Sequence, residues 1–442
     1  MAFEYKFPPT HEMVLSNGMR VISVPERTLD GVILAFQLPF GRFNDPVGLE
    51  GLCDILAAHI QKGIENISHE EFVDSFEYRG ASTGASVGEE HTVFLCRMLS
   101  KHFDDLFPLF WKMICNPALN KAEFDRIKKE AITSLQAEAV DPSFLANRHF
   151  YQQLVGKGHP AGRFQTIESL RKIKLNDIRQ FYKEVFSPED TIFVAGGDFN
   201  EHSFKETYID KYLNSWSAKR TVELTSASGI KLVEPATRFI DKKDLTQSTV
   251  IIGHTVPGES SPKRNALSLA NYILGAGNFS SRLMNRVRSR YGKTYGISSQ
   301  IAGEKNFGVF SISTTTKNQS VGETVKAIFE EYDNFCAHGV TDLELQKAKT
   351  FTIGNISFQL EGISNVVDKL LWLRYHGKEN SYIEQFGKKL ESMDLDYING
   401  LIKTEFHPDK AVMAVVGRKE EVASQIENLG RKVTFYDQRN VI

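Results

Sequence analysis

The sequence predicts an α+β fold of two similar domains, each a mainly antiparallel sheet packed with long helices. The main observation is an internal repeat, because residues 168–197 align with residues 388–417 without gaps at a constant offset of 220. A repeat this long is typical of duplicated domains, since solenoid units run about 20–50 residues. Strand patterns also alternate with long helical patterns without strict β-α-β spacing, which favours α+β. The matched pairs are Leu170 and Leu390, Leu175 and Leu395, Ile178 and Ile398, Phe186 and Phe406, Pro188 and Pro408, and Gly197 and Gly417.

The length and one polar stretch set the expected domain boundaries. A chain of 442 residues is long enough for two or three domains of about 100–200 residues each. The segment SAKRTVELTSASGI is polar and shows no helical or strand period. We therefore predict a first domain at 1–215, a linker at 216–240 and a second domain at 241–442.

The first domain opens with strand-like alternation in MVLSNGMRVISVPE, where Asn17-Gly18 is a signal for a hairpin turn. VILAFQLPF predicts the next strand, and a stripe of apolar residues predicts a helix at 47–62 that ends at Gly63. The remaining expected elements are a helix at 69–79, a glycine-interrupted strand pair in GASTGASVGEEHTVFLCRML, helices over roughly 101–155, a helix in the repeated segment and the strand TIFVAGG.

The second domain repeats this order. STVIIGHTVPG predicts a strand, and Ser261-Pro262 begins a helix that closes at Gly275. SRLMNRVRSR predicts a second helix. The later expected elements are the strands YGISSQI and FGVFSISTTT, helices from about 320 to 405 and the strand AVMAVVG.

Composition excludes several classes of function. The chain carries 53 basic and 55 acidic residues, for a net charge of −2, which gives no case for nucleic acid or an anionic membrane as the main partner. No apolar run approaches the ~18–20 residues that span a bilayer. The start, MAFEYKFPPTHE, lacks the pattern of a signal peptide. Four scattered cysteines fit reduced thiols, so we expect a cytoplasmic protein.

Several segments together resemble the inverted-zincin metallopeptidases, the family of pitrilysin, insulysin and the mitochondrial processing peptidase. LSNGMRV, the helix at 47–62, GASTGAS and the Asp-Pro and His-Pro steps near 141 and 159 follow the family order. ILGAGNFSSRLMNRVRSRYGKTYG looks like the family's second-domain segment. The resemblance covers nearly the whole chain and implies one half of a clam-shaped peptidase.

The resemblance also implies a metal site that this sequence lacks. Active members carry H-x-x-E-H on the first helix, where two histidines on one helix face bind zinc and the glutamate activates its water. The matching segment GLCDILAAHIQKG places Asp54, Ala57 and Ala58 at these positions. Alanine has no lone pair, and one aspartate cannot supply three zinc ligands. The position of the family's third ligand falls near Ser134-Leu135. We expect no metal on this chain, and we expect His59 to be a structural or an exposed histidine rather than a ligand.

The second domain keeps a different part of the family's site. In this family an arginine and a tyrosine seven residues apart reach from the second half towards the metal, and the match here falls on Arg288 and Tyr295. A guanidinium and a phenol hydroxyl can hold a peptide backbone and stabilise the negative charge that builds on an attacked carbonyl oxygen.

The resemblance therefore implies a zinc-less subunit of a heterodimeric metallopeptidase. A homologous partner with H-x-x-E-H would carry the zinc, and this chain would lend Arg288 and Tyr295 to peptide substrates. Peptides in such relatives add a strand to a sheet edge, which GASTGASVGEEHTV would provide here. One alternative is a non-enzymatic scaffold, since relatives without zinc serve as core proteins of respiratory complexes. A second is a peptide-binding homodimer without catalysis.

Overall fold

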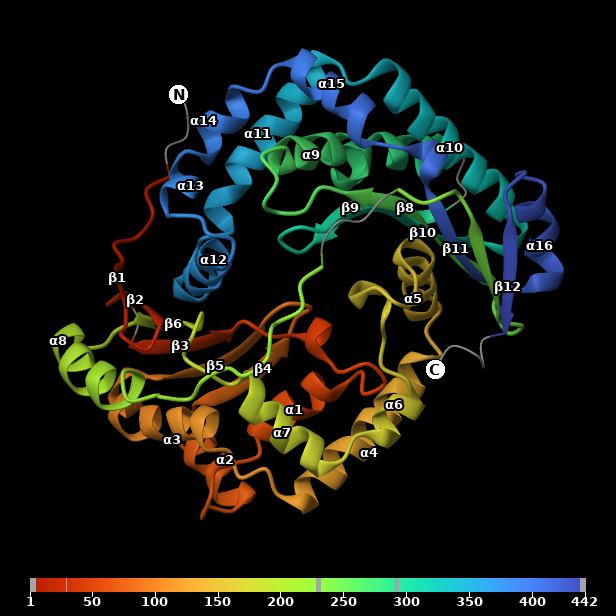
Figure 1. The fold of residues 1–442 in the computed structure, drawn as a ribbon. Coiled ribbons are helices and arrows are strands. Elements are labelled where there is room, and N and C mark those ends of the chain that lie inside the picture. Colours follow the sequence, from red (N-terminus) through yellow and green to blue (C-terminus); the bar gives the residue numbers. More distant parts are fainter. Residues whose placement is uncertain (1–4, 29, 228–231, 291–293, 438–442) are drawn as a thin grey trace.

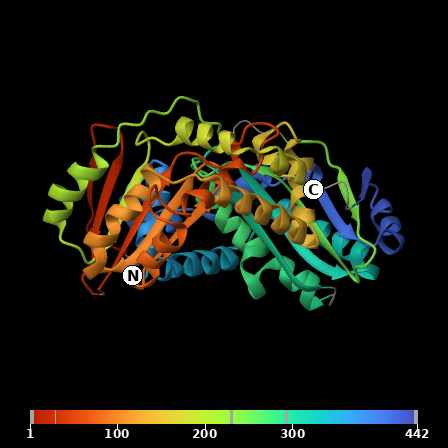
Figure 2. The same ribbon diagram turned by 90° about the horizontal axis from the view of Figure 1, so that it is seen from below.

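The protein folds into two halves, each built around a six-stranded sheet (Figure 1). The computed structural model describes residues 5–28, 30–227, 232–290 and 294–437, with only the backbone of 288–290 and 294–295. Figure 2 shows the two halves side by side, the red-to-orange half next to the green-to-blue half. The two-domain α+β fold predicted from the repeat is confirmed.

The first sheet has the strand order β1-β2-β6-β3-β5-β4. Only β2 and β6 run parallel, and the other neighbouring pairs are antiparallel. The predicted hairpin turn lies between β1 and β2, where Gly18 has φ +89° and Asn17 Oδ1 accepts a hydrogen bond from the Met19 N–H. The strands are β1 (His11–Val14), β2 (Arg20–Pro25), β3 (Gly31–Leu38), β4 (Ser82–Val87), β5 (Thr92–Leu99) and β6 (Ile192–Gly197).

The second sheet has the order β12-β7-β11-β8-β10-β9, in which the five strands from β7 to β9 repeat the arrangement of β2 to β4. The outer strands differ, because β12 runs parallel to β7 whereas β1 runs antiparallel to β2. β7 runs parallel to β11, as β2 does to β6. β7 begins at Thr237, so its first four residues lie within the stretch 216–240 that we expected to be linker. The strands are β7 (Thr237–Asp241), β8 (Gln247–Val256), β9 (Thr294–Gly303), β10 (Gly308–Lys317), β11 (Val412–Gly417) and β12 (Val433–Asp437).

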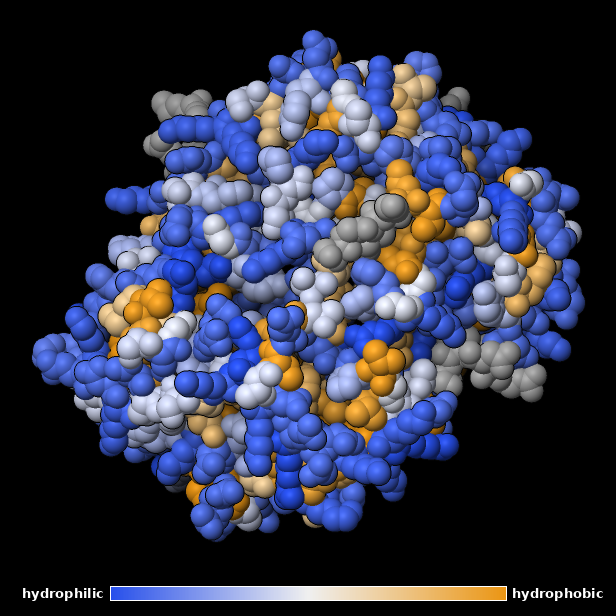
Figure 3. Space-filling model, in the orientation of Figure 1, coloured by the Kyte–Doolittle hydropathy of each residue, from blue (hydrophilic) through white to orange (hydrophobic). Residues whose placement is uncertain are grey.

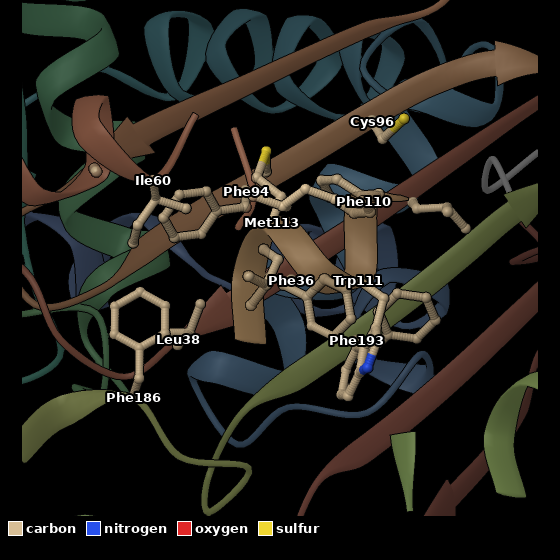
Figure 4. Close-up of a cluster of buried hydrophobic side chains, with 14 of the residues drawn as sticks. Phe36, Leu38, Ile60, Phe94, Cys96, Phe110, Trp111, Met113, Phe186 and Phe193 are labelled. Carbon is tan, nitrogen blue, oxygen red and sulfur yellow. The ribbon is translucent and has the colours of Figure 1, made fainter. Parts of the chain in front are cut away.

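Helices cover the outer face of the first sheet and enclose an aromatic core. Phe36 of β3 lies 4.4 Å from Phe193 of β6 and 5.8 Å from both Phe110 and Trp111 of α3, measured between ring centroids (Figure 4). Burying each such ring contributes roughly 1.5–3 kcal/mol. The helices are α1 (Leu52–Ile60), α2 (His69–Glu77), α3 (Phe103–Cys115), α4 (Lys121–Glu138), α6 (Ile167–Lys172), α7 (Leu175–Val185), α8 (Glu201–Ser203) and a π-helix (Phe204–Leu213).

The second half has a corresponding helical layer. α7 and α15, like β6 and β11, begin 220 residues apart, as the repeat predicts. The predicted helix SRLMNRVRSR forms, but as a π-helix that begins at Met284. The helices are α9 (Arg264–Asn271), π-helices (Tyr272–Ala276 and Met284–Arg290), α10 (Val321–His338), α11 (Asp342–Phe358), α13 (Ser381–Glu384), α14 (Phe386–Glu391), α15 (Leu395–Glu405) and α16 (Lys419–Glu427).

The two halves exchange one helix each. α5 (Pro142–Val155) belongs to the first copy but packs on β8 and β11 of the second sheet, whereas α12 (Ile363–Tyr375) packs on β3 and β6 of the first (Figure 1). Both approaches are close, because a Cβ at Gly196 of β6 would lie 2.7 Å from Val367 and one at Gly253 of β8 would lie 3.0 Å from Phe150. Each half therefore completes the core of the other.

The surface is mainly polar on the face drawn in Figure 3, where hydrophobic residues form small separate groups. Among the residues that the structure describes, no helix combines the length and apolar character needed to cross a bilayer.

Candidate functional site

The helix that would carry the metal motif begins where a buried carboxylate holds its first turn. Asp45 accepts hydrogen bonds from the N–H groups of Gly51 and Cys53, each at 2.7 Å. Burial raises the pKa of Asp45 to about 7, although these hydrogen bonds act to lower it. α1 consequently spans Leu52–Ile60, a shorter range than the predicted 47–62.

The three motif positions on α1 do not form a metal site. The Asp54 carboxylate is held by Arg42, whose Nε and Nη2 donate to it at 2.9 and 2.8 Å. Ala57 is buried in the core and Ala58 packs partly against it. A methyl group cannot ligate a cation, and Asp54 is already paired, so these residues do not fit zinc.

The expected region of the third ligand gives no replacement. Leu135 is fully buried, while the Ser134 hydroxyl lies 3.1 Å from a Glu138 oxygen. Glu130 pairs with Arg126. Within the described part of the chain, no group of three or more His, Cys, Asp or Glu side chains is placed to hold a metal ion. His59 is 1% exposed, and burial lowers its pKa to about 4.

A cavity of about 520 Å³ covers the start of α1 and extends to the turn between β9 and β10. It thus lies where the metal motif would stand, with walls from both halves of the molecule. Segments around Arg42 and Arg163, the end of α4 and one side of α5 complete the lining. Its charged residues are Arg42, Asp45, Glu50, Asp54, Glu89, Glu138, Arg148, Arg163 and Glu304.

Most of the charges in this cavity are neutralised or hydrogen-bonded. Arg42 pairs with Asp54 and lies 3.5 Å from Glu89. Arg163 donates to the backbone carbonyls of Asp45 and Phe43 at 2.9 and 2.7 Å. Arg148 and Glu304 have no ion-pair partner among the described residues, and the Glu304 carboxylate has no hydrogen-bond donor there either. Of the three degenerate motif positions, Asp54 alone lines this charged cavity.

Arg288 and Tyr295 lie outside the described side chains. Their backbones fall on two neighbouring elements, since Arg288 is in the π-helix Met284–Arg290 and Tyr295 is the second residue of β9. β9 is the edge strand of the second sheet. Ion pairs hold the residues just before Arg288. Arg282 Nε lies 2.7 Å from a carboxylate oxygen of Glu344, and Arg286 Nη2 lies 2.8 Å from a carboxylate oxygen of Glu330.

The residues that make this cavity charged were not predicted from the sequence. Arg42, Arg148 and Glu304 come from segments far apart in the chain, and none belongs to a spaced motif. The only local signal is position on a helix, because Asn147, Arg148 and Tyr151 fall within one turn of α5. Their meeting depends on α5 packing against the opposite half.

Two family models match the chain. The model described as Insulinase (Peptidase family M16) matches residues 20–156. The model described as Peptidase M16 inactive domain matches residues 172–351. Together the matches follow the chain from β2 into α11.

Known proteins resemble the chain over most of its length. The Non-peptidase homolog YmxG of Helicobacter pylori is 24% identical over 384 residues, which cover 84% of this chain and 85% of that protein. The crystal structure of a peptidase M16 inactive domain from Pseudomonas fluorescens has a TM-score of 0.85 at 21% identity, covering 93% of this chain and 98% of that one. The periplasmic protease PqqL from Escherichia coli has a TM-score of 0.77 at 16% identity, covering 94% of this chain but 46% of that chain. With both family models matched in order and the fold shared, the chain belongs to peptidase family M16, as a homologue whose metal-binding helix is degenerate.

Proposed function

We propose that the chain is the zinc-less subunit of a heterodimeric zinc metallopeptidase that acts on unfolded peptides. The observation that carries this proposal is the state of α1. Asp54 is bound by Arg42 and the other two motif positions are alanines, so the helix offers no ligand set. A homologous partner with an intact motif would hold the zinc, which activates a water when bound.

The chain's contribution comes from Arg288 and Tyr295. A guanidinium and a phenol hydroxyl donate hydrogen bonds to a substrate carbonyl and stabilise the charge that develops on its oxygen. Tyr295 is the second residue of the edge strand β9, whose backbone groups are suited to pair with an extended peptide. This placement supports a role in orienting peptide backbone next to the partner's metal.

The first half offers a second edge for peptide binding. β4 (Ser82–Val87), which takes in all but the first two residues of the GASTGAS segment, is the edge strand of the first sheet, as predicted. A Cβ at Gly84 would meet no atom within 4 Å, so the face of the sheet is open above this residue. The position of β4 at the edge of the sheet supports strand addition there.

The length of one relative supports a second subunit. The chain matches 46% of PqqL, and another crystal structure contains the first half of PqqL, which the chain covers completely at a TM-score of 0.77. A separate polypeptide would supply the other half here. We place the complex in the cytoplasm, which the four free cysteines favour.

The test uses a tagged chain purified from its native cells together with its bound partner. The complex is expected to contain about one zinc per pair of subunits and to cleave a quenched peptide, whereas the isolated chain does neither. Arg288→Ala and Tyr295→Phe should each lower kcat/KM of the complex at least about tenfold, or ~1.4 kcal/mol, without loss of assembly. Lys347→Ala, an exposed change on α11, is the control. Full activity in both variants would refute the role of the pair.

A second candidate is a non-enzymatic protein derived from the same family. The name of the Helicobacter pylori relative, a non-peptidase homolog, favours it. In that case the chain would act as a scaffold or would bind peptides, alone or as a homodimer. The same purification separates the two functions, because a scaffold complex would contain no zinc and would leave the quenched peptide intact.

A further inference from the structure

The cavity above α1 contains two side chains of opposite charge that do not meet. Arg148 lies on α5 and Glu304 lies in the turn between β9 and β10, and both line the same space. The other arginines of the cavity each have a carboxylate partner, since Arg42 pairs with Asp54 at 2.8 Å and Arg163 lies 4.0 Å from Glu50. The two unpaired charges therefore remain available to a third molecule.

Arg148 is a guanidinium placed in an apolar setting without a counter-ion. The residue is 3% exposed, and its guanidinium lies 5.1 Å from the Phe164 ring centroid and 5.9 Å from that of Phe144. Its Nη2 donates to the Gln165 carbonyl at 2.8 Å, while Nε has no hydrogen-bond partner. Burial lowers its pKa to about 10. A buried, unpaired charge is costly, so such a group in a cleft marks a candidate binding site.

Glu304 presents the opposite charge from the turn between β9 and β10. Its backbone N–H donates to the Phe307 carbonyl at 2.8 Å, which fixes the turn. The carboxylate has no hydrogen-bond or ion-pair partner among the described residues. Burial raises its pKa to about 7, and repulsion from Glu90, Glu89 and Glu259 adds to this shift. A cation bound here would relieve that repulsion.

Neutral polar groups lie on the same wall as Arg148. Asn147 and Tyr151 are four residues apart on α5 and so share one side of the helix. Burial, then Glu89 and Glu304, raise the pKa of Tyr151 to about 12, which keeps its hydroxyl protonated. These groups can donate hydrogen bonds to a peptide carbonyl.

We propose that this cavity binds a short peptide with both ends free, its carboxylate on Arg148 and its ammonium group on Glu304. Because both charges line one cavity and do not pair with each other, a ligand with two opposite charges can engage both. A tripeptide extends to about 10 Å, and a volume of about 520 Å³ lies within the usual range for small-ligand sites. The site is separate from Arg288 and Tyr295, so it stands whether or not the proposed subunit role does.

Calorimetry on the full-length chain tests the proposal with three probes. Trialanine carries both charges, N-acetyl-trialanine lacks the ammonium group, and trialanine amide lacks the carboxylate. Trialanine should bind, and blocking either end should weaken binding at least about tenfold. No binding of trialanine at ~10 mM, or equal binding of all three probes, would overturn the proposal. Dependence on one end alone would overturn it too, because the site would then recognise a single charge.

Variants assign each end to its residue. Glu304→Gln should weaken trialanine binding about tenfold while leaving N-acetyl-trialanine unchanged, because that probe has no ammonium group to lose. Arg148→Met should show the reverse pattern, with trialanine amide unchanged. Glu427→Gln, an exposed change on α16, is the matched control. If Glu304→Gln weakened both probes equally, the assignment of the ammonium group would be wrong. Since Glu304→Gln changes only a turn, this result does not depend on Arg148→Met folding.

Discussion

The two halves of the molecule share one strand order but differ in the chemistry beside it. In the first half, α1 carries Asp54 paired to Arg42 and opens into a charged cavity. In the second half, the hollow between α5 and strands β8 to β10 is lined mainly by serine, threonine and glutamine, including Ser298, Gln300 and Ser313. The difference teaches that duplication preserves the frame while the site residues diverge. The frame can persist because its cores depend on exchanged apolar helices, not on the site.

The largest expected effect comes from breaking this exchange. Phe150 of α5 is fully buried against the second sheet, so Phe150→Ala should lower the free energy of unfolding by about 3–5 kcal/mol. Its counterpart is Leu370 of α12, buried against the first sheet, where Leu370→Ala should cost about 2–5 kcal/mol. Urea unfolding followed by circular dichroism measures both.

Coupling between the halves is the sharper part of this prediction. Because each helix completes the core of the other half, each variant should unfold in a single transition. The slope of its unfolding free energy against urea concentration should equal that of the wild type. A loss below about 1 kcal/mol, or separate transitions for the two halves, would contradict the account. Val47→Ala, at a side chain that is 85% exposed, serves as the control.

The repeat explains how much of the fold could be predicted. Matching Leu175 with Leu395 and Phe186 with Phe406 placed α7, α15, β6 and β11 correctly, since local pattern and the duplicated order agree there. The exchange of α5 and α12 was not predicted, because apolar spacing defines a buried helix face but not the sheet that it meets. The predicted start of the helix at 47–62 was wrong for a similar reason, as Asp45 caps α1 from outside its own pattern.

The site was predictable only where it follows a motif. The loss of ligands at Asp54, Ala57 and Ala58 could be identified by alignment to the family pattern on one helix. Arg148 and Glu304 could not, because their roles come from packing between segments more than 150 residues apart. The pair Arg288 and Tyr295 stays a prediction.

A medium effect is expected from the pH dependence of a buried histidine in the second half. In β8, His254 Nε2 accepts hydrogen bonds from the Tyr332 hydroxyl at 2.6 Å and the His407 N–H at 3.1 Å. Burial lowers its pKa to about 4, below the unfolded value of about 6.5. Between these two pKa values the unfolded state binds more protons than the folded state. The free energy of unfolding therefore falls as the pH falls from the unfolded towards the folded pKa. The expected loss from pH 7 to 5 is about 2 kcal/mol.

Replacing the titrating group tests this assignment. His254→Gln should reduce the loss of unfolding free energy between pH 7 and 5 by about 2 kcal/mol, measured by urea unfolding at both values. His59 of the first half is the comparison, because burial lowers its pKa to about 4 as well. An identical pH dependence in wild type and His254→Gln would show that this histidine does not titrate as described.

The smallest effect is expected at the ion pair that occupies the degenerate motif. The side chains of Arg42 and Asp54 are 44% and 33% exposed, so solvent screens their attraction. Arg42→Ala should therefore lower the free energy of unfolding by less than about 1 kcal/mol. A loss above about 2 kcal/mol in urea unfolding would mean that the pair stabilises α1 as a buried one would.

Metal analysis of the purified chain, alone and in complex with its native partner, tests the central claim most directly. The degenerate donor set on α1 predicts far less than one zinc and no peptide cleavage for the chain alone, and about one zinc with cleavage for the complex. One tightly bound zinc in the isolated chain, together with cleavage of the quenched peptide by that chain alone, would contradict the account.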